Sequence, residues 1–134
     1  MTQEDKELLL RDLCGRLPYG IKGNYQNSDD ELLRKVTIMY RYLEPNGMVM
    51  TGDIKPYLFP LSSMTREQLY ELREMFGFEI EFSEDSIELS TFHHNCLGYL
   101  EMVSLFEWFN KNHFDYRGLI SKGLAIDCTN LNIY

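Results

Sequence analysis

The sequence has 134 residues, of which 44% are hydrophobic, and a formal net charge of −8 at pH 7. This length fits one domain, residues 1–134, that buries roughly two thirds of the surface of its unfolded chain. No apolar run approaches the roughly 20 residues that cross a bilayer, which excludes a membrane-spanning helix. Three widely spaced cysteines without a CxxC pair predict reduced, mostly buried thiols in a soluble, cytoplasmic protein.

The acidic excess is unevenly distributed along the chain. The last 25 residues carry three basic and two acidic side chains, so residues 1–109 hold a net charge of −9. Binding to a phosphate backbone requires clustered lysine and arginine, so direct nucleic-acid binding is not expected. A basic protein partner is compatible with this charge, although acidic surfaces also serve solubility alone.

The first predicted helix spans residues 3–16. Thr2 is a typical N-cap, two acidic residues follow it in the first turn, and Pro18 ends the helix. Apolar residues recur in this segment with the i, i+3, i+4, i+7 spacing of a core-facing stripe. The members of this stripe are Leu10, Leu13, Cys14 and Leu17.

A β-hairpin is predicted for residues 34–50. Residues 34–43 alternate between apolar and polar side chains, as a half-buried strand does. The tetrapeptide EPNG at Glu44–Gly47 suits a type I turn, so residues 48–50 are expected to return as a second strand. The following DIKPYLFP is broken by prolines and is not assigned to a strand. The apolar face of the first strand comprises Val36, Ile38, Tyr40 and Tyr42.

The segment MTREQLYELREMFG carries helix signals at both ends. Thr65 and Gln68 occupy the N-cap and N3 positions of a capping box, and Gly77 follows as a stop signal. We therefore predict a helix over residues 65–76. Its apolar stripe consists of Leu69, Leu72, Met75 and Phe76.

The next segment, FEIEFSEDSIELSTF, predicts a second hairpin. A turn centred on residues 84–85 keeps the apolar residues on one face of the two strands. The expected cross-strand pairs are Ile80 with Leu89 and Phe82 with Ile87. The same register sets Glu81 opposite Glu88, and like charges directly opposed across a strand pair are destabilising. The pair therefore calls for a nearby cation, supplied by Lys35 and Arg41, or for screening by solvent; a metal ion or a basic partner is the alternative.

The last predicted helix, residues 97–112, is apolar on more than one side. A surface helix needs only one apolar stripe, and here the polar residues form a narrow stripe of their own. The tail that follows is rich in large apolar residues, namely Phe114, Leu119, Ile120, Leu124, Ile126, Leu131 and Ile133. Exposed tails are usually poor in such residues. We therefore expect the tail to belong to the core, and an exposed docking strip is the alternative.

These elements together predict an α+β fold. An antiparallel sheet of about four or five strands packs against about three helices. The helices lie near residues 3–16, 65–76 and 97–112, and the C-terminal tail wraps over the last of them.

The densest group of chemically useful side chains lies in HFDYRG, after the last helix. His113, Asp115, Tyr116 and Arg117 offer an acid, a base and an anion clamp within five positions. Asp53 and Lys55 are further candidates if the fold brings them close. The structural alternative is a helix exit, in which these polar side chains satisfy the last helical carbonyls and a turn.

Recognisable catalytic and cofactor motifs are absent. The chain has no GxSxG, P-loop or GxGxxG pattern. The segment HHNC, with His93, His94 and Cys96, lacks the usual zinc spacings, and adjacent histidines on a strand point to opposite faces. No metal site, cofactor or catalytic residue is therefore assigned.

Two stretches carry a family resemblance: GDIKPYLFPLSSMT at residues 52–65 and NKNHFDYRGLISKGLAID at residues 110–127. They resemble a family of small uncharacterised proteins from gut Bacteroidetes and their phages or prophages. The first helix of that family also runs into an RLPYG-like segment, which is Arg16–Gly20 here. The resemblance implies a bacterial or phage cytoplasmic setting, and it carries over no catalytic residue.

The leading functional hypothesis is a non-enzymatic binding or regulatory protein that acts through protein–protein contact. A small enzyme with a site around residues 113–117 is the first alternative. An acidic mimic of nucleic acid that inhibits a DNA-binding protein is the second, because carboxylates arrayed on one surface would be its binding element. The candidate acidic surface consists of Glu79, Glu81, Glu84, Asp85 and Glu88.

Overall fold

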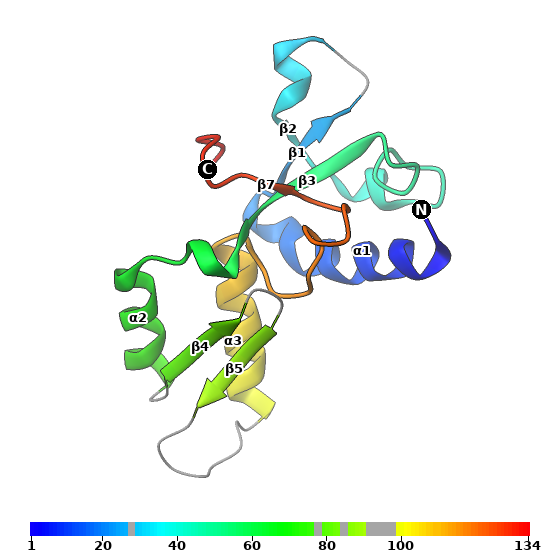
Figure 1. Ribbon diagram of the computed structural model, residues 1–134. Helices are drawn as coiled ribbons and strands as arrows, with labels where there is room; N and C mark the ends of the chain where they lie inside the picture. The colour runs from blue at the N-terminus through cyan, green and yellow to red at the C-terminus, as the bar shows by residue number, and fades with distance from the viewer. Residues whose placement is uncertain (27–28, 77–78, 84–85, 91–98) are drawn as a thin grey trace.

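The computed structural model describes residues 1–26, 29–76, 79–83, 86–90 and 99–134 (Figure 1). Three α-helices lie within these ranges: α1 (Gln3–Arg16), α2 (Arg66–Phe76) and α3 (Tyr99–Lys111). Four short 3-10 turns accompany them: η1 (Leu17–Tyr19), η2 (Glu31–Arg34), η3 (Tyr40–Leu43) and η4 (Leu61–Ser63). The predicted α+β class and the three helices are confirmed.

The main sheet has five strands in the described part of the chain. They are β1 (Lys22–Tyr25), β2 (Val36–Thr37), β3 (Ile54–Pro60), β6 (Phe114–Asp115) and β7 (Ile126–Asp127). β1 is antiparallel to β2 and β3, whereas β6 and β7 are parallel to β3. The sheet is therefore mixed and not purely antiparallel. The chain passes through α2 and α3 before it returns beside β3, and such crossovers produce parallel pairs.

The central strand of this sheet, β3, lies in the segment DIKPYLFP. This segment was not predicted to be a strand because it contains two prolines. The amide of Gln26 donates to the carbonyl of Asp53, and the amide of Ile54 donates to Met48 on the other edge. Because edges alternate along a strand, the N-side of Pro56 faces away from β1. β7 pairs only with Tyr57 and Leu58 on β3. The N–H that Pro56 lacks therefore falls where neither β1 nor β7 requires a donor.

The hairpin predicted for residues 34–50 is wrong. Only Val36 and Thr37 form a strand, and residues 40–43 form η3. The type I turn is nevertheless present, because the amide of Gly47 donates to the carbonyl of Glu44 at 2.7 Å. A Cβ on Gly47 would lie 2.3 Å from the Tyr42 carbonyl oxygen. This close backbone approach folds residues 42–52 into successive turns instead of a second strand.

Helix α1 forms where expected, but a different face is buried. Thr2 and Asp5 make a reciprocal capping box. The predicted core residues Leu10 and Cys14 are exposed. The four buried positions also follow helical spacing. Two of them carry charged side chains, so an apolar pattern does not identify this face. These positions are Leu9, Asp12, Leu13 and Arg16.

Helices α2 and α3 pack against each other around Trp108. The predicted capping box of α2 is confirmed, because Thr65 and Gln68 each accept a hydrogen bond from the other's backbone amide. Leu72 of α2 is fully buried, but Met75 is 54% exposed, so the predicted stripe is only partly a core face. On α3, Met102 and Val103 are exposed. The second apolar side of this helix is therefore not fully covered.

Two hydrophobic clusters form the interior. The first joins α1 to the sheet and contains Leu119, Leu124 and Ala125 of the C-terminal tail. The second joins α2, α3 and β6 around Leu72, Trp108 and Phe109. The tail is core, as predicted, and its residues divide between the two clusters. Phe114 packs in the cluster that contains α3, whereas Leu119, Leu124 and Ala125 pack with α1 and the sheet. Figure 1 shows the tail crossing beside β3 through β7.

The hairpin of β4 (Glu79–Ser83) and β5 (Ser86–Ser90) has the predicted backbone register. Ile80 is paired with Leu89, and Phe82 is paired with Ile87. The register also pairs Glu81 with Glu88. β4 lies against α2 and η4.

Candidate functional site

The candidate residues of HFDYRG lie where β6 leaves the end of α3, but they serve different contacts. Asp115 is paired with Pro60 of β3 and is 7% exposed. Its carboxylate accepts the backbone amides of Arg117, Leu119 and Ile120 at 3.3, 2.9 and 2.9 Å. These three bonds use most of the acceptor capacity of the carboxylate. Asp115 therefore holds the following turn together, as the helix-exit interpretation predicted for such residues.

A shallow hollow of about 130 Å³ lies beside Asp115. It is well below the roughly 300–1,000 Å³ typical of small-molecule sites. Its only ionisable lining groups are Asp115, which is already bonded to the turn, and the phenol of Tyr116. The hollow is lined by Pro60, Leu61, Asp115, Tyr116, Gly118, Ile120 and Ser121. This geometry offers space for solvent and supplies no acid–base pair to a substrate.

Arg117 and Tyr116 turn toward a buried charge pair on α1. Arg16 binds Asp12 through two bonds, Nε to Oδ2 at 2.7 Å and Nη2 to Oδ1 at 3.0 Å, and both side chains are fully buried. Nη2 also donates to the carbonyl of Phe114 at 2.6 Å. Arg117 Nε lies 3.4 Å from Asp12 Oδ1. Burial raises the pKa of Asp12, and the two guanidinium groups act in the opposite direction.

The aromatic ring of Tyr116 completes this cluster. The guanidinium carbons of Arg16 and Arg117 lie 5.3 and 5.1 Å from its centroid, and its hydroxyl donates to Asn110 Oδ1. Cation–π contacts of this kind stabilise a buried arginine. Removing one partner of a buried ion pair is strongly destabilising. The cluster therefore fastens the turn after β6 to α1.

His113 does not join Asp115 in an acid–base arrangement. It has a φ of 64° at the end of α3, and its ring stacks on Tyr134 with a centroid separation of 3.6 Å. Its Nδ1 is buried and makes no hydrogen bond. Burial, with a smaller contribution from the charge of Arg16, lowers the pKa of His113 to about 4. The imidazole is therefore neutral at pH 7.

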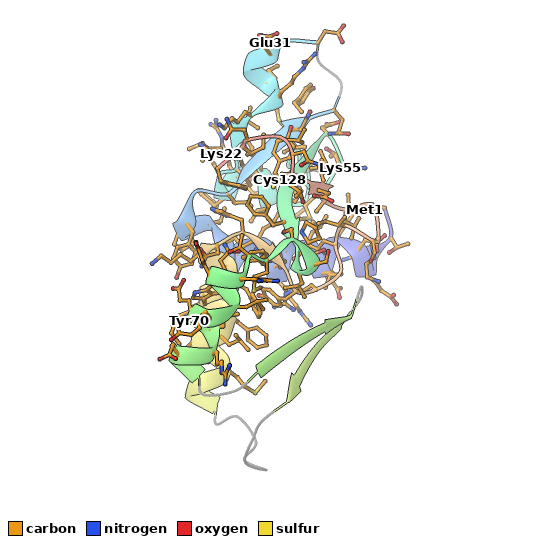
Figure 2. All side chains as sticks on the ribbon, turned by 60° about the vertical axis from the view of Figure 1, so that its left-hand side comes forward. Met1, Lys22, Glu31, Lys55, Tyr70 and Cys128 are labelled. Atoms are coloured by element: carbon orange, nitrogen blue, oxygen red, sulfur yellow. The ribbon has the colours of Figure 1, made fainter. Side chains whose placement is uncertain are left out.

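Asp53 and Lys55 lie at the start of β3, away from the other candidates. Asp53 accepts a hydrogen bond from Thr51, and Lys55 is paired in register with Asn24. Asp115 is paired with Pro60, which lies five residues after Lys55 on β3. This separation corresponds to about 16 Å along the strand. Figure 2 shows Lys55 beside the upper strands, far from Tyr70 on α2. The structure does not bring these two residues to His113 or Asp115.

The candidate acidic surface is described only in its backbone. Glu79 and Glu81 lie on β4 and Glu88 on β5, whereas Glu84 and Asp85 lie outside the described residues. The cation expected beside Glu81 and Glu88, and the nucleic-acid mimic built on them, stay predictions.

Metal ligands offer no alternative site in the described ranges. No group of three or more histidine, cysteine or carboxylate side chains is placed to hold a metal ion there. His93, His94 and Cys96 lie outside the described residues. Cys14 is exposed, which differs from the predicted burial, and burial raises the pKa of Cys128 to about 11. The described helices include none long and apolar enough to span a bilayer.

An apolar groove between α1 and the turns after η3 was missed by the sequence analysis. It measures about 210 Å³, and most of its exposed lining is apolar. Leu10, assigned to the core from its spacing, is 42% exposed and lines this groove. A signal was present in the apolar residues Pro45 and Met50 at and after EPNG, but their proximity to α1 depends on the tertiary fold. The groove is lined by Gln3, Lys6, Glu7, Leu10, Leu43, Pro45 and Met50.

Comparison with known proteins yields no match to a family model, a curated protein or a solved structure.

Proposed function

We propose that the protein is a non-enzymatic binding protein that acts through protein–protein contact in a bacterial or phage cytoplasm. The apolar groove between α1 and residues 43–50 is the observation that carries this proposal. The polar residues that suggested catalysis are engaged elsewhere: Asp115 caps a turn, and Arg117 contacts the buried Asp12. The groove, in contrast, exposes the apolar side chains of Leu10 and Pro45 to solvent.

The size and chemistry of the groove favour an amino-acid side chain over a metabolite. Its volume of about 210 Å³ falls below the roughly 300–1,000 Å³ of typical small-molecule sites. The apolar lining consists of the exposed Leu10 and Pro45 above a floor of the buried Leu43 and Met50. A single aliphatic or aromatic anchor residue from a partner would fill such a space.

The net charge of the chain indicates the charge expected of the partner. The groove lies within residues 1–109, which hold the net charge of −9. Its charged lining consists of Glu7 and Lys6, so the groove itself is balanced in charge, and the acidic excess is carried by the chain as a whole. We therefore infer a basic segment that inserts one apolar side chain, with association that weakens as salt rises.

Leu10→Glu tests the proposal by placing a charge in the groove. Tagged protein is incubated with a bacterial lysate at low and moderate salt, and retained proteins are quantified by mass spectrometry. The matched control is Leu33→Glu, because Leu33 is 37% exposed on η2, outside the groove. We expect the wild type and the control to retain a basic protein. Leu10→Glu should retain at least about tenfold less of it, as loss of a hot-spot contact would produce.

A photo-crosslinking residue at position 10, compared with one at position 33, identifies direct contact in the same lysate. Circular dichroism confirms that both glutamate variants fold. Retention of the same proteins by Leu10→Glu, or crosslinks from position 33 and none from position 10, would rule out the groove. Retention of no protein by the wild type at either salt concentration would overturn the binding function itself.

A further inference from the structure

The hydroxyl of Tyr134 occupies a gap in the main sheet. It accepts a hydrogen bond from the backbone amide of Lys22 at 2.9 Å and donates one to the carbonyl of Tyr57 at 2.9 Å. Gly23 is paired with Pro56, so Lys22 and Tyr57 are the next partners in the β1–β3 register. In a continued ladder these two groups would bond directly to each other. The phenol hydroxyl is inserted between them instead.

This gap lies where β3 changes its partner. The Gln26 amide donates to the carbonyl of Asp53, which therefore faces β1. Because every second residue of a strand faces the same edge, the backbone groups of Lys55, Tyr57 and Phe59 face this edge too. The Phe59 amide donates to the carbonyl of His113 at 2.8 Å, so β6 occupies this edge after β1 has left it. Between the two neighbours, the carbonyl of Tyr57 and the amide of Lys22 form a fixed acceptor–donor pair. Only a group that both donates and accepts a hydrogen bond satisfies them together.

The walls of the gap match an aromatic ring. His113 stacks on Tyr134 with an interplanar angle of 9°, and Phe59 lies 5.9 Å away between centroids at 51°. His113 holds the left-handed conformation that ends a helix, a position usually taken by glycine or asparagine. Its backbone is therefore strained, and its ring is the group that lies against the phenol. Burial raises the pKa of Tyr134, so the ring is held as a neutral phenol.

We propose that this gap is a binding site for the tyrosine side chain of another polypeptide, and that Tyr134 fills it as a tethered ligand. The site combines a parallel aromatic wall with a paired donor and acceptor, which together select a phenol over a plain phenyl ring. A phenyl ring would leave the Lys22 amide and the Tyr57 carbonyl unpaired, and sites built around a hydroxyl reject such analogues strongly. This inference concerns a surface other than the groove and does not depend on it.

The tail that delivers Tyr134 is lightly held. Residues 129–132 are exposed, and the hydrogen bonds described for Thr129 and Leu131 go to Asp127 and Cys128 within the same segment. Cys128 is anchored by its amide to the carbonyl of Leu58 and is 1% exposed. Apart from the half-buried Ile133 and the contacts of Tyr134 itself, little holds the segment after Cys128, so we expect it to exchange without disturbing the sheet. A tethered ligand acts at an effective concentration of about millimolar, so an incoming tyrosine competes only when the tail is displaced or absent.

Tyr134→Ala opens the site, and p-cresol is the probe for it. In this variant we expect p-cresol, at several times its dissociation constant, to raise Tm by about 3 °C. Toluene at the same concentration should have less than a third of that effect, and the wild type should respond to neither compound. The peptide TNLNIY, residues 129–134, should shift the NMR resonance of the Lys22 amide in the variant. The same peptide with phenylalanine in place of tyrosine should not. Equal effects of p-cresol and toluene, or of the two peptides, would overturn the proposal.

Hydrogen exchange in the unaltered protein provides a measurement that does not depend on the folding of the variant. If the tail opens on its own, the Lys22 amide exchanges at least about tenfold faster than the amide of Asn24, which is paired with Lys55 within the β1–β3 ladder. Equal exchange of the two amides would show that Tyr134 leaves only when the sheet unfolds. That result would exclude a replaceable ligand.

Discussion

His113 combines an unusual backbone conformation with a constrained ring. Its φ of 64° lies in the left-handed region, where most side chains are strained. Its ring is stacked on Tyr134, and its Nδ1 is buried without a hydrogen-bond partner. A proton added to this imidazole would be buried beside the positive Arg16. The folded protein therefore strongly prefers the neutral ring.

This preference predicts a loss of stability on acidification. The pKa of His113 is about 4 in the folded protein and 6.5 when unperturbed, so the unfolded chain binds the proton first as pH falls. The free energy of unfolding should thus be unaffected above about pH 7 and should drop by about 2 kcal/mol between pH 7 and pH 5 through this group. Urea titrations of the wild type and His113→Asn measure it, because asparagine tolerates the left-handed backbone. Equal pH dependence in both proteins would contradict the assignment.

At the scale of elements, β3 organises the molecule because other strands approach both of its edges. Its close contact with β1 depends on Gly23, which is paired with Pro56. A Cβ on Gly23 would lie 2.7 Å from Ile54 Cγ2 and 3.0 Å from the Lys55 carbonyl oxygen. One of these neighbours is backbone, so the strand itself would have to move. The absence of a side chain at this position is therefore required by the packing of β1 on β3.

Gly23→Ala is expected to lower the free energy of unfolding by about 1–3 kcal/mol, the usual cost of overpacking. Gly15→Ala is the matched control on α1, where the added methyl meets only the end of the Asn110 side chain at 2.9 Å. Alanine also has a higher helix propensity than glycine by about 1 kcal/mol, which offsets that contact. Thermal and urea denaturation compare the two variants. A larger loss for Gly15→Ala than for Gly23→Ala would refute the argument.

At the scale of the whole molecule, two clusters share a continuous set of elements. Ile54 and Leu58 of β3 lie in the cluster with α1, and the neighbouring Phe59 packs against the cluster of α2 and α3. Arg16 of α1 also bonds to the carbonyl of Phe114 in β6, whose side chain belongs to the second cluster. These connections favour a single cooperative unit over residues 1–134, as the length of the chain predicts.

Leu13→Ala and Leu72→Ala test this cooperativity, because each removes a fully buried side chain from a different cluster. Each variant should lose about 2–5 kcal/mol, the range for leucine truncation in a core. Both should still unfold in one transition, with coincident midpoints by tryptophan fluorescence and far-UV circular dichroism. Trp108 reports on the second cluster. A midpoint that shifts by only one of the two probes would indicate two independently folding parts.

Elements whose stabilising contacts are local could be predicted from the amino-acid pattern. The Thr65–Gln68 capping box joins residues three positions apart, and it is present as predicted. The β4–β5 register follows from alternating apolar residues on either side of a short turn, and it too is confirmed. The composition of the tail also indicated correctly that it belongs to the core. In the capping box and the hairpin, the pattern and the contact lie within a few residues, so the pattern is sufficient. For the tail, the composition predicted burial but not the distant partners, which are α1 and β3.

The tertiary structure alone decided the edges of the sheet and the candidate sites. The bond from Arg16 to the Phe114 carbonyl spans 98 positions, and the bond from Lys22 to Tyr134 spans 112. The first turns a charged residue of α1 inward, and this inward rotation accompanies the exposure of Leu10 in the groove. The second places the phenol of Tyr134 between β1 and β3, and this position could be predicted only if the pairing of these strands were already known. Periodicity reports which residues share a face, but burial and strand pairing depend on which distant segment covers that face.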